Sequence, residues 1–77
     1  RYLTEVDIVT LGDWEKKIAR NEIYARHGRK FNSAELQQYF DSMDWYTPSI
    51  EAKDFKDEML NDVERYNTRL ISQYENK

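Results

Sequence analysis

The sequence predicts an all-α fold, a compact bundle of three main helices with a short extra helical turn at the N-terminus. Three observations support this prediction. Apolar residues recur at helical spacing in three stretches, and no stretch alternates as a strand would. Paired capping residues stand where these stretches begin. The chain contains two glycines and one proline, which lie between the stretches or at their edges.

Composition places the 77 residues in one domain, residues 1–77, of a size at which one core supplies about 3–5 kcal/mol of net stability. Only 39% of residues are hydrophobic, but 14% are aromatic, so large rings must provide much of the core. Cysteine is absent, which leaves no disulfide and no thiolate zinc site. No apolar run is long enough for a membrane span, so we expect no membrane insertion by this segment.

The first short turn is predicted over residues 4–9, with Thr4 as its N-cap and Asp7 three residues later in a capping box. Thr10 and Asp13 repeat this arrangement. They therefore predict the start of the first main helix.

That first main helix is predicted from Leu11 to His27, and Gly28 is expected to end it in the left-handed conformation. Its main apolar stripe contains Leu11, Trp14, Ile18, Asn21 and Ala25. The opposite side carries Ala19, Ile23 and His27. We therefore expect this helix to have packing contacts on two sides.

The second helix is predicted over Ser33–Ser42, because Asn32 and Glu35 match a capping box. One face carries Leu36, Tyr39, Phe40 and Met43. Pro48 disfavours helix at the residue before it, and an irregular acidic loop is expected over residues 49–56.

The last helix is predicted from Asp57 to Glu75. Its apolar stripe contains Met59, Val63, Tyr66, Leu70 and Tyr74, is widened by Leu60 and Ile71, and includes Asn67.

The charges are unevenly distributed, since residues 16–30 hold six Lys or Arg residues against one acid, Glu22. One interpretation is an anion site, where Arg20, Arg26, Arg29 and Lys30 converge on a phosphate or carboxylate. The other is internal neutralisation, with Glu64 paired to Arg20 or Arg26. A helix C-terminus is the wrong dipole end for an anion, which favours neutralisation. The acidic balance of the whole chain argues against nucleic acid as a partner.

Catalysis is not indicated by the polar residues. His27 is the single histidine, and no nucleophile or orienting carboxylate is placed beside it by the sequence. In the last turn of a helix, a histidine interacts favourably with the negative helix end, so a capping or packing role is expected. We predict no cofactor and no metal site.

Asn21 and Asn67 each interrupt an apolar stripe, so both should be buried and need hydrogen-bond partners. Our hypothesis is that they are structural pins that fix the helix register by bonding each other or a loop backbone, such as that of residues 28–32. The aromatic residues Tyr24, Phe31, Tyr39, Trp45 and Tyr46 could form a sugar-stacking platform, but this chain needs them as its core, with Tyr24 partly exposed.

The stretch Asn21-Glu22-Ile23-Tyr24-Ala25-Arg26-His27-Gly28, followed by Arg29-Lys30-Phe31, resembles the signature of the YARHG domain family. Tyr39-Phe40, Trp45-Tyr46 with Pro48, and Leu60-Asn61 leading to Glu64 and Asn67 extend the resemblance from about residue 10 to residue 75. The family is a small presumed extracellular module, typically outside the membrane of Gram-positive bacteria. The resemblance implies a cell-surface setting without an established ligand or catalytic residue.

On the strength of this resemblance, we expect a non-catalytic, extracellular cell-surface binding or interaction module of a bacterial membrane-anchored protein. The expected partner is a cell-wall polymer or a surface protein. Its candidate ligand-binding residues are Tyr24, Arg26, His27, Arg29 and Lys30, and Asn21, Asn67 and Glu64 are candidate structural polar residues. The alternatives are a cell-wall-modifying hydrolase, which would need a cleft with His27 beside a carboxylate, and a passive spacer domain.

Overall fold

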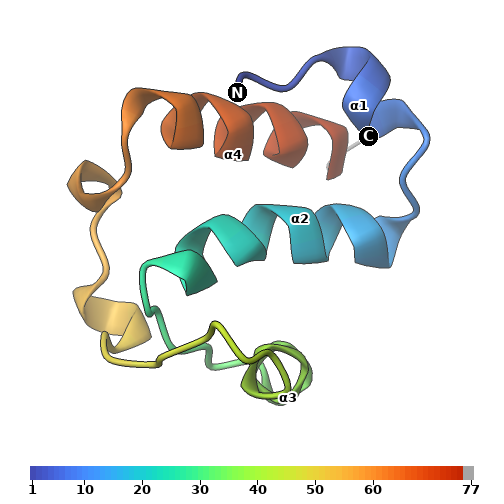
Figure 1. The fold of residues 1–77 in the computed structure, drawn as a ribbon. Helices are drawn as coiled ribbons and strands as arrows, with labels where there is room; N and C mark the ends of the chain where they lie inside the picture. The colour runs from blue at the N-terminus through green and yellow to red at the C-terminus, as the bar shows by residue number, and fades with distance from the viewer. Residues whose placement is uncertain (76–77) are drawn as a thin grey trace.

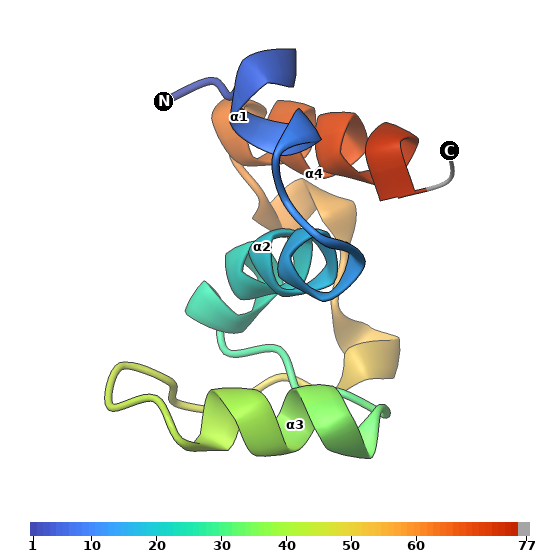
Figure 2. The same cartoon turned by 90° about the vertical axis from the view of Figure 1, so that its right-hand side faces the viewer.

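Helix α2 is the middle layer of a three-layer helical stack in the computed structural model, which describes residues 1–75 (Figure 1). Helix α4 packs along one side of α2 and runs in the opposite direction, while α3 lies crosswise against the other side (Figures 1 and 2). The elements are α1 (Glu5–Val9), α2 (Asp13–Arg26), α3 (Ala34–Asp41), the 3₁₀ turns Ala52–Asp54 and Asp57–Met59, and α4 (Asp62–Glu75). The predicted all-α class and the two-sided packing of the first main helix are confirmed.

The side of α2 that faces α3 is packed with rings, and we call this region the aromatic layer. Phe40 is fully buried, and its ring centroid lies 5.1 Å from that of Phe31 and 6.0 Å from that of Tyr46. The layer contains the buried residues Ala25, Phe31, Leu36, Phe40 and Tyr46, with Ile18, Tyr24, Tyr39, Met43 and Trp45 packed against them. The prediction that these rings form the core is confirmed.

The side of α2 that faces α4 mixes aliphatic and polar side chains, and we call this region the polar layer. Ile8, Leu60 and Ile71 are buried on this side of the molecule, and so are the polar side chains of Asn21, Asn67 and Thr68. Helix α1 packs against α4 (Figure 1).

The helix starts differ from those predicted, except at α1. Thr4 caps α1 as expected, and its backbone N–H donates to the Asp7 carboxylate at 2.8 Å. Thr10 instead ends α1, so α2 begins two residues later than predicted. Gly12 is its N-cap, and the Gly12 N–H donates to the Glu15 carboxylate at 2.8 Å.

Helix α3 is capped by Ser33 rather than Asn32, and the Ser33 hydroxyl accepts from the Leu36 N–H. The prediction that Asn32 is the N-cap is wrong. Asn32 and Ser33 are adjacent, and both residue types are good N-caps, so the sequence did not distinguish between them. Phe31 N–H donates to the Gln37 side chain at 2.8 Å, which holds the preceding segment against α3.

Helix α4 begins at Asp62, five residues after the predicted start at Asp57. The chain is extended at Leu60, which is 3% exposed and fills the core. Asn61 and Glu64 then form reciprocal side-chain to backbone hydrogen bonds of 2.8 Å, which satisfy free N–H groups of the first turn.

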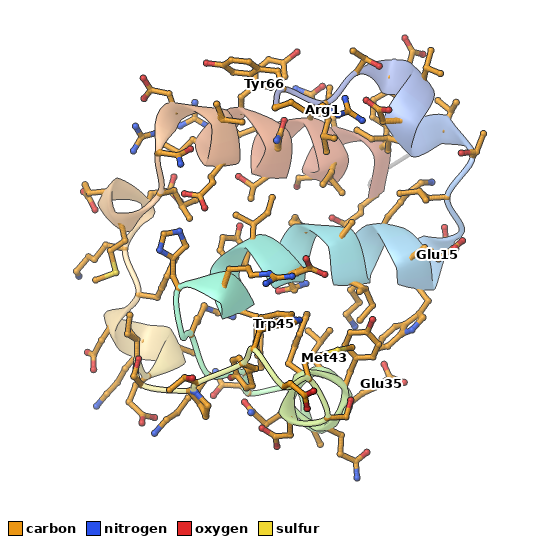
Figure 3. The ribbon with its side chains drawn as sticks, in the orientation of Figure 1. Arg1, Glu15, Glu35, Met43, Trp45 and Tyr66 are labelled. Carbon is orange, nitrogen blue, oxygen red and sulfur yellow. The ribbon has the colours of Figure 1, made fainter. Side chains whose placement is uncertain are left out.

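Three residues of the predicted stripes lie at the surface. Trp14 is 40% exposed, Met59 43% and Tyr66 47%. Met59 precedes the true helix, so helical spacing did not apply to it. Tyr66 lies on the outer side of α4 beside the N-terminal segment, whereas Met43 and Trp45 lie between α2 and α3 (Figure 3). The Tyr66 ring meets the Tyr2 ring edge to face, with the two ring centroids 5.1 Å apart.

Candidate functional site

The turn at Gly28 joins α2 to the loop that follows α3. Gly28 has a φ of +90°, as predicted for the residue that ends the helix. Its carbonyl accepts from the N–H groups of Ser49 and Ile50, at 2.8 and 2.9 Å, and Lys30 N–H donates to the Ile50 carbonyl. A Cβ at residue 28 would lie 2.9 Å from the Thr47 carbonyl oxygen, so the close approach itself requires glycine. Residues 49–56, expected as an irregular loop, contain the 3₁₀ turn Ala52–Asp54 and are joined to the end of α2 through Ser49 and Ile50.

The two residues at the end of α2 before His27 face the aromatic layer or its edge. Ala25 is 1% exposed, and its small side chain lies in the tightly packed aromatic layer. The Arg26 guanidinium lies 3.8 Å from the Trp45 ring centroid, a cation–π contact, and 3.3 Å from the Glu22 carboxylate. Glu22 and Arg26 thus form an ion pair across one helical turn, and Arg26 is engaged within the domain.

His27 joins α2 to α4. It is the C-cap of α2, and its Nε2 lies 3.0 and 2.9 Å from the two carboxylate oxygens of Glu64. The same carboxylate accepts the Asn61 N–H at the start of α4. The Phe55 ring meets the imidazole edge to face. Glu64 therefore pairs with His27, and the predicted pairing with Arg20 or Arg26 is wrong, because α4 begins where α2 ends and brings these two residues together.

Most cations of residues 16–30 that were candidates for convergence are neutralised separately. Arg20 pairs with Glu75 of α4, with Nη2 to Oε2 at 3.3 Å, and this bonded carboxylate raises the pKa of the guanidinium. Lys30 pairs with Glu51 at 2.6 Å, and its ammonium lowers the pKa of that carboxyl. The four candidate cations thus do not converge on one point.

Arg29 differs from these cations. Its guanidinium lies 5.1 Å from the Phe31 ring centroid and 5.5 Å from that of Tyr24, so two rings hold it in place. Among residues 1–75, no hydrogen bond or ion pair is found for this guanidinium. Arg29 is also partly buried. Its five N–H donors are thus positioned and available to a ligand.

A surface hollow of about 250 Å³ is lined by Arg29, and we call it the Arg29 hollow. Its other main lining residues are Arg20, Asn21 and Tyr24 from α2, and Phe55 and Asp57 from the segment before α4. The rings of Tyr24 and Phe55 meet edge to face at 5.5 Å. Arginine donors and aromatic walls therefore face a common space.

Asn21 contributes an acceptor to this hollow. It is 5% exposed, and its Nδ2 donates to the Lys17 carbonyl of its own helix at 2.8 Å. No described residue donates to its Oδ1, which leaves that oxygen available to a hydroxyl in the hollow. Asn21 is buried as predicted, but it bonds neither Asn67 nor residues 28–32.

Asn67 bonds a loop backbone, as the hypothesis predicted, and this backbone belongs to the N-terminal segment. Its Oδ1 accepts the Leu3 N–H at 2.8 Å, and its Nδ2 donates to the Arg1 carbonyl at 2.9 Å. Leu3 and Arg1 are more than sixty residues away from Asn67 in the sequence, so helical periodicity could not predict these hydrogen bonds.

Of the predicted ligand residues, the structure brings Tyr24 and Arg29 together at one hollow. Arg26, His27 and Lys30 do not line this hollow. Phe55 and Asp57 were not among the predicted site residues. No local pattern could have indicated a site there, since both lie in the segment of short 3₁₀ turns between α3 and α4.

The fold and site together define a small all-helical domain with an arginine-lined surface hollow and a helix junction built from residues 24–28. The chain belongs to the YARHG domain family, whose sequence profile matches residues 1–76. This family is a small presumed extracellular domain of unknown function. Neither a curated protein nor a solved structure shows significant similarity to the chain.

The family pentapeptide Tyr24–Gly28 acts mainly as a structural junction. The contacts described above join Ala25 to the aromatic layer, Arg26 to Trp45, His27 to Glu64 and Gly28 to the loop at Ser49. Of the five residues, Tyr24 is the one that lines the Arg29 hollow. No helix within residues 1–75 has the length and apolar character needed to cross a bilayer. Within the same residues, no group of three or more acidic, histidine or cysteine side chains is placed to hold a metal ion.

Proposed function

We propose that this domain is a non-catalytic binding module of the bacterial cell surface that holds an anionic group of a cell-wall polymer in the Arg29 hollow. The observation that carries the proposal is the ring-held guanidinium of Arg29, for which no acidic partner is found in residues 1–75. Guanidinium groups bind phosphate and carboxylate through two parallel hydrogen bonds, which suits a preoriented arginine at a hollow.

The surrounding groups favour an anion that carries hydroxyl groups. Arg20 adds a second guanidinium to the hollow, already held by Glu75. Asn21 Oδ1 and the Asp57 carboxylate are acceptors on the same lining, and acceptors bind hydroxyls rather than a second anion. A sugar or polyol phosphate, or a sugar acid, combines both features.

The hydrolase alternative is less well supported by the position of His27. A carboxylate does lie beside it, but both Glu64 oxygens are engaged, by His27 Nε2 and by the Asn61 N–H. Moreover, His27 does not line the Arg29 hollow. A passive spacer does not explain an arginine held ready at a hollow.

Co-sedimentation with insoluble Gram-positive cell walls tests the proposal. The purified domain should sediment with intact walls at low salt, and binding should fall in high salt or after removal of the anionic polymers. Arg29→Ala should weaken binding by about tenfold or more, because hydrogen bonds to charged groups contribute about 1.5–3 kcal/mol.

The matched control is Lys30→Ala, which removes the same charge one residue away from the hollow. It should bind walls like the unaltered domain, and both variants should keep the helical circular dichroism spectrum. Absence of wall binding under every condition, or equal binding by Arg29→Ala and Lys30→Ala, would refute the proposal.

A further inference from the structure

Three hollows follow one another across the surface formed by α2 and α4. The Arg29 hollow shares Arg20, Tyr24 and Asp57 with a second hollow of about 140 Å³, which lies between α2 and α4 and which we call the seam hollow. The seam hollow shares Arg69 with a third, of about 410 Å³, on the outer side of α4, which we call the outer hollow. Shared lining residues place the three hollows next to one another, and we call them together the track.

Arginines occur along the whole track. Arg29 and Arg20 line its first part, Arg20 and Arg69 its middle, and Arg69 and Arg65 its far end. Arg65 and Arg69 stand one helical turn apart, so both project from the same side of α4. Each hollow therefore presents two guanidinium groups.

The arginines differ in how far they are neutralised by the domain itself. Arg65 pairs with Asp62 at 2.7 Å, and Arg20 pairs with Glu75. For Arg69, as for Arg29, no ion pair or hydrogen bond through the guanidinium is found in residues 1–75. The track thus has one uncompensated guanidinium in its first hollow and another where its second and third hollows meet.

The aspartates of the track lie between these two positions or beside a paired arginine. Asp57 lines both the Arg29 hollow and the seam hollow, and Asp62 of the outer hollow is paired with Arg65. A small anion would need only one of the free guanidiniums. Two of them, at neighbouring hollows of the track, suit anionic groups that repeat along a chain.

We infer that the ligand is a linear polyanion, a chain with repeating phosphate or carboxylate groups, that runs from the Arg29 hollow through the seam hollow and contacts Arg69. This inference rests on the proposed function and extends it from one anionic group to a polymer that spans two helices. Linking two anionic groups in one chain makes the second contact intramolecular, so affinity rises with chain length until the track is filled.

Titration calorimetry with pyrophosphate and a series of longer linear polyphosphates tests the inference. Affinity should rise with chain length beyond the effect of ligand charge number. Arg69→Ala should weaken binding of the long chain by about three- to tenfold and leave pyrophosphate binding unchanged, because only the chain reaches Arg69. Arg29→Ala should weaken both ligands. Lys30→Ala, which changes net charge equally outside the track, should weaken neither.

Salt dependence gives a second readout that a purely structural effect would not change. The slope of log affinity against log salt for the long chain should decrease in magnitude by about one in Arg69→Ala, since one fewer counterion is released. Poly-glutamate of matched charge tells whether the repeating group is carboxylate or phosphate, and preferred binding of either one supports a polyanion track.

Four outcomes would overturn the inference. Equal affinity for short and long chains, or equal long-chain binding by Arg69→Ala and Lys30→Ala, would remove the track but leave the Arg29 site intact. Tighter binding of single-stranded DNA of matched charge than of both other polymers would point to nucleic acid as the partner instead. If no anion of any length bound the unaltered domain, the proposed function itself would fail.

Discussion

The two sides of α2 are held by different chemistry. The aromatic layer packs rings around Phe40, which is completely inaccessible to solvent. The polar layer joins α2 to α4 through aliphatic residues and through directional contacts, namely His27 with Glu64 and Arg20 with Glu75. Burying rings stabilises without specifying a register, whereas a hydrogen bond is made in one register only.

This difference explains where the candidate site lies. A fully packed ring cluster leaves no polar group available for a ligand. Guanidinium groups line hollows at the edge of the polar layer, and those left without a protein partner can bind a ligand. The two layers meet at the Arg29 hollow, because Arg29 lies against the Tyr24 and Phe31 rings while Arg20 pairs with Glu75 of α4.

The largest expected effect is that of Phe40→Ala in the aromatic layer. Removing a fully buried ring leaves a cavity and costs about 3–5 kcal/mol of folding free energy, most of what a domain of this size has. Chemical denaturation monitored by circular dichroism measures the loss.

Tyr66→Ala is the control for Phe40→Ala, because its ring is 47% exposed on the outer side of α4. We expect it to cost less than about 1 kcal/mol, as for an exposed aromatic pair. Similar losses in the two variants would show that the aromatic layer is not the main source of stability.

A smaller effect is expected from Asn67→Leu in the polar layer. The substitution removes two hydrogen bonds to the N-terminal segment and leaves the Leu3 N–H and the Arg1 carbonyl unpaired. We expect a loss of about 1–2 kcal/mol in the free energy of unfolding, less than for a fully buried pair because both partners lie near the surface. Hydrogen exchange at the Leu3 amide should accelerate.

Asn21→Leu is the matched change for Asn67→Leu. Asn21 bonds only a carbonyl of its own helix, so its replacement should cost less. If Asn67→Leu raised the free energy of unfolding above that of the unaltered domain, directional contacts would not be what stabilises the polar layer.

The smallest expected effect is that of acid on the N-terminal segment. The Arg1 guanidinium and the Thr4 N–H hold the pKa of Asp7 well below its usual range. The stability contributed by Asp7 is therefore fully present above its unfolded pKa of about 4, and is lost as the pH falls through its lower folded pKa. The melting temperature should fall between about pH 4 and pH 2, and Asp7→Asn should make this fall shallower.

Asp44→Asn serves as the control for Asp7→Asn, since Asp44 is exposed and no ion pair is found for it in the described chain. Its acid profile should match that of the unaltered domain. Identical profiles for Asp7→Asn and Asp44→Asn would show that the Asp7 contacts contribute nothing measurable to stability.

The candidate site could be predicted only in part. The excess of positive charge in residues 16–30 indicated Arg20 and Arg29 as candidate anion-binding residues, and both line the Arg29 hollow. The same excess also indicated Arg26 and Lys30, whose carboxylate partners are Glu22 and Glu51. The Glu22 pair follows from helical spacing, but the Glu51 pair depends on how the loop after α3 returns to Gly28.

The sequence by itself determined the helical class, the capping box of α1, the end of α2 at Gly28 and the rings of the core. These depend on contacts within a few residues or on the bulk of the side chains, which local patterns report directly. The adjacent cap residues Asn32 and Ser33 left the N-cap of α3 ambiguous by one position. The start of α4 was predicted five residues too early.

Only the tertiary structure decided which long-range partners meet. The Glu64–His27 pair, the Asn67 bonds to the N-terminal segment and the free guanidiniums of Arg29 and Arg69 all depend on how α4 lies against α2. Such pairings join residues far apart in the chain, and their geometry follows from the packing of whole helices. No local pattern of residues encodes that packing, so the binding surface became visible only in three dimensions.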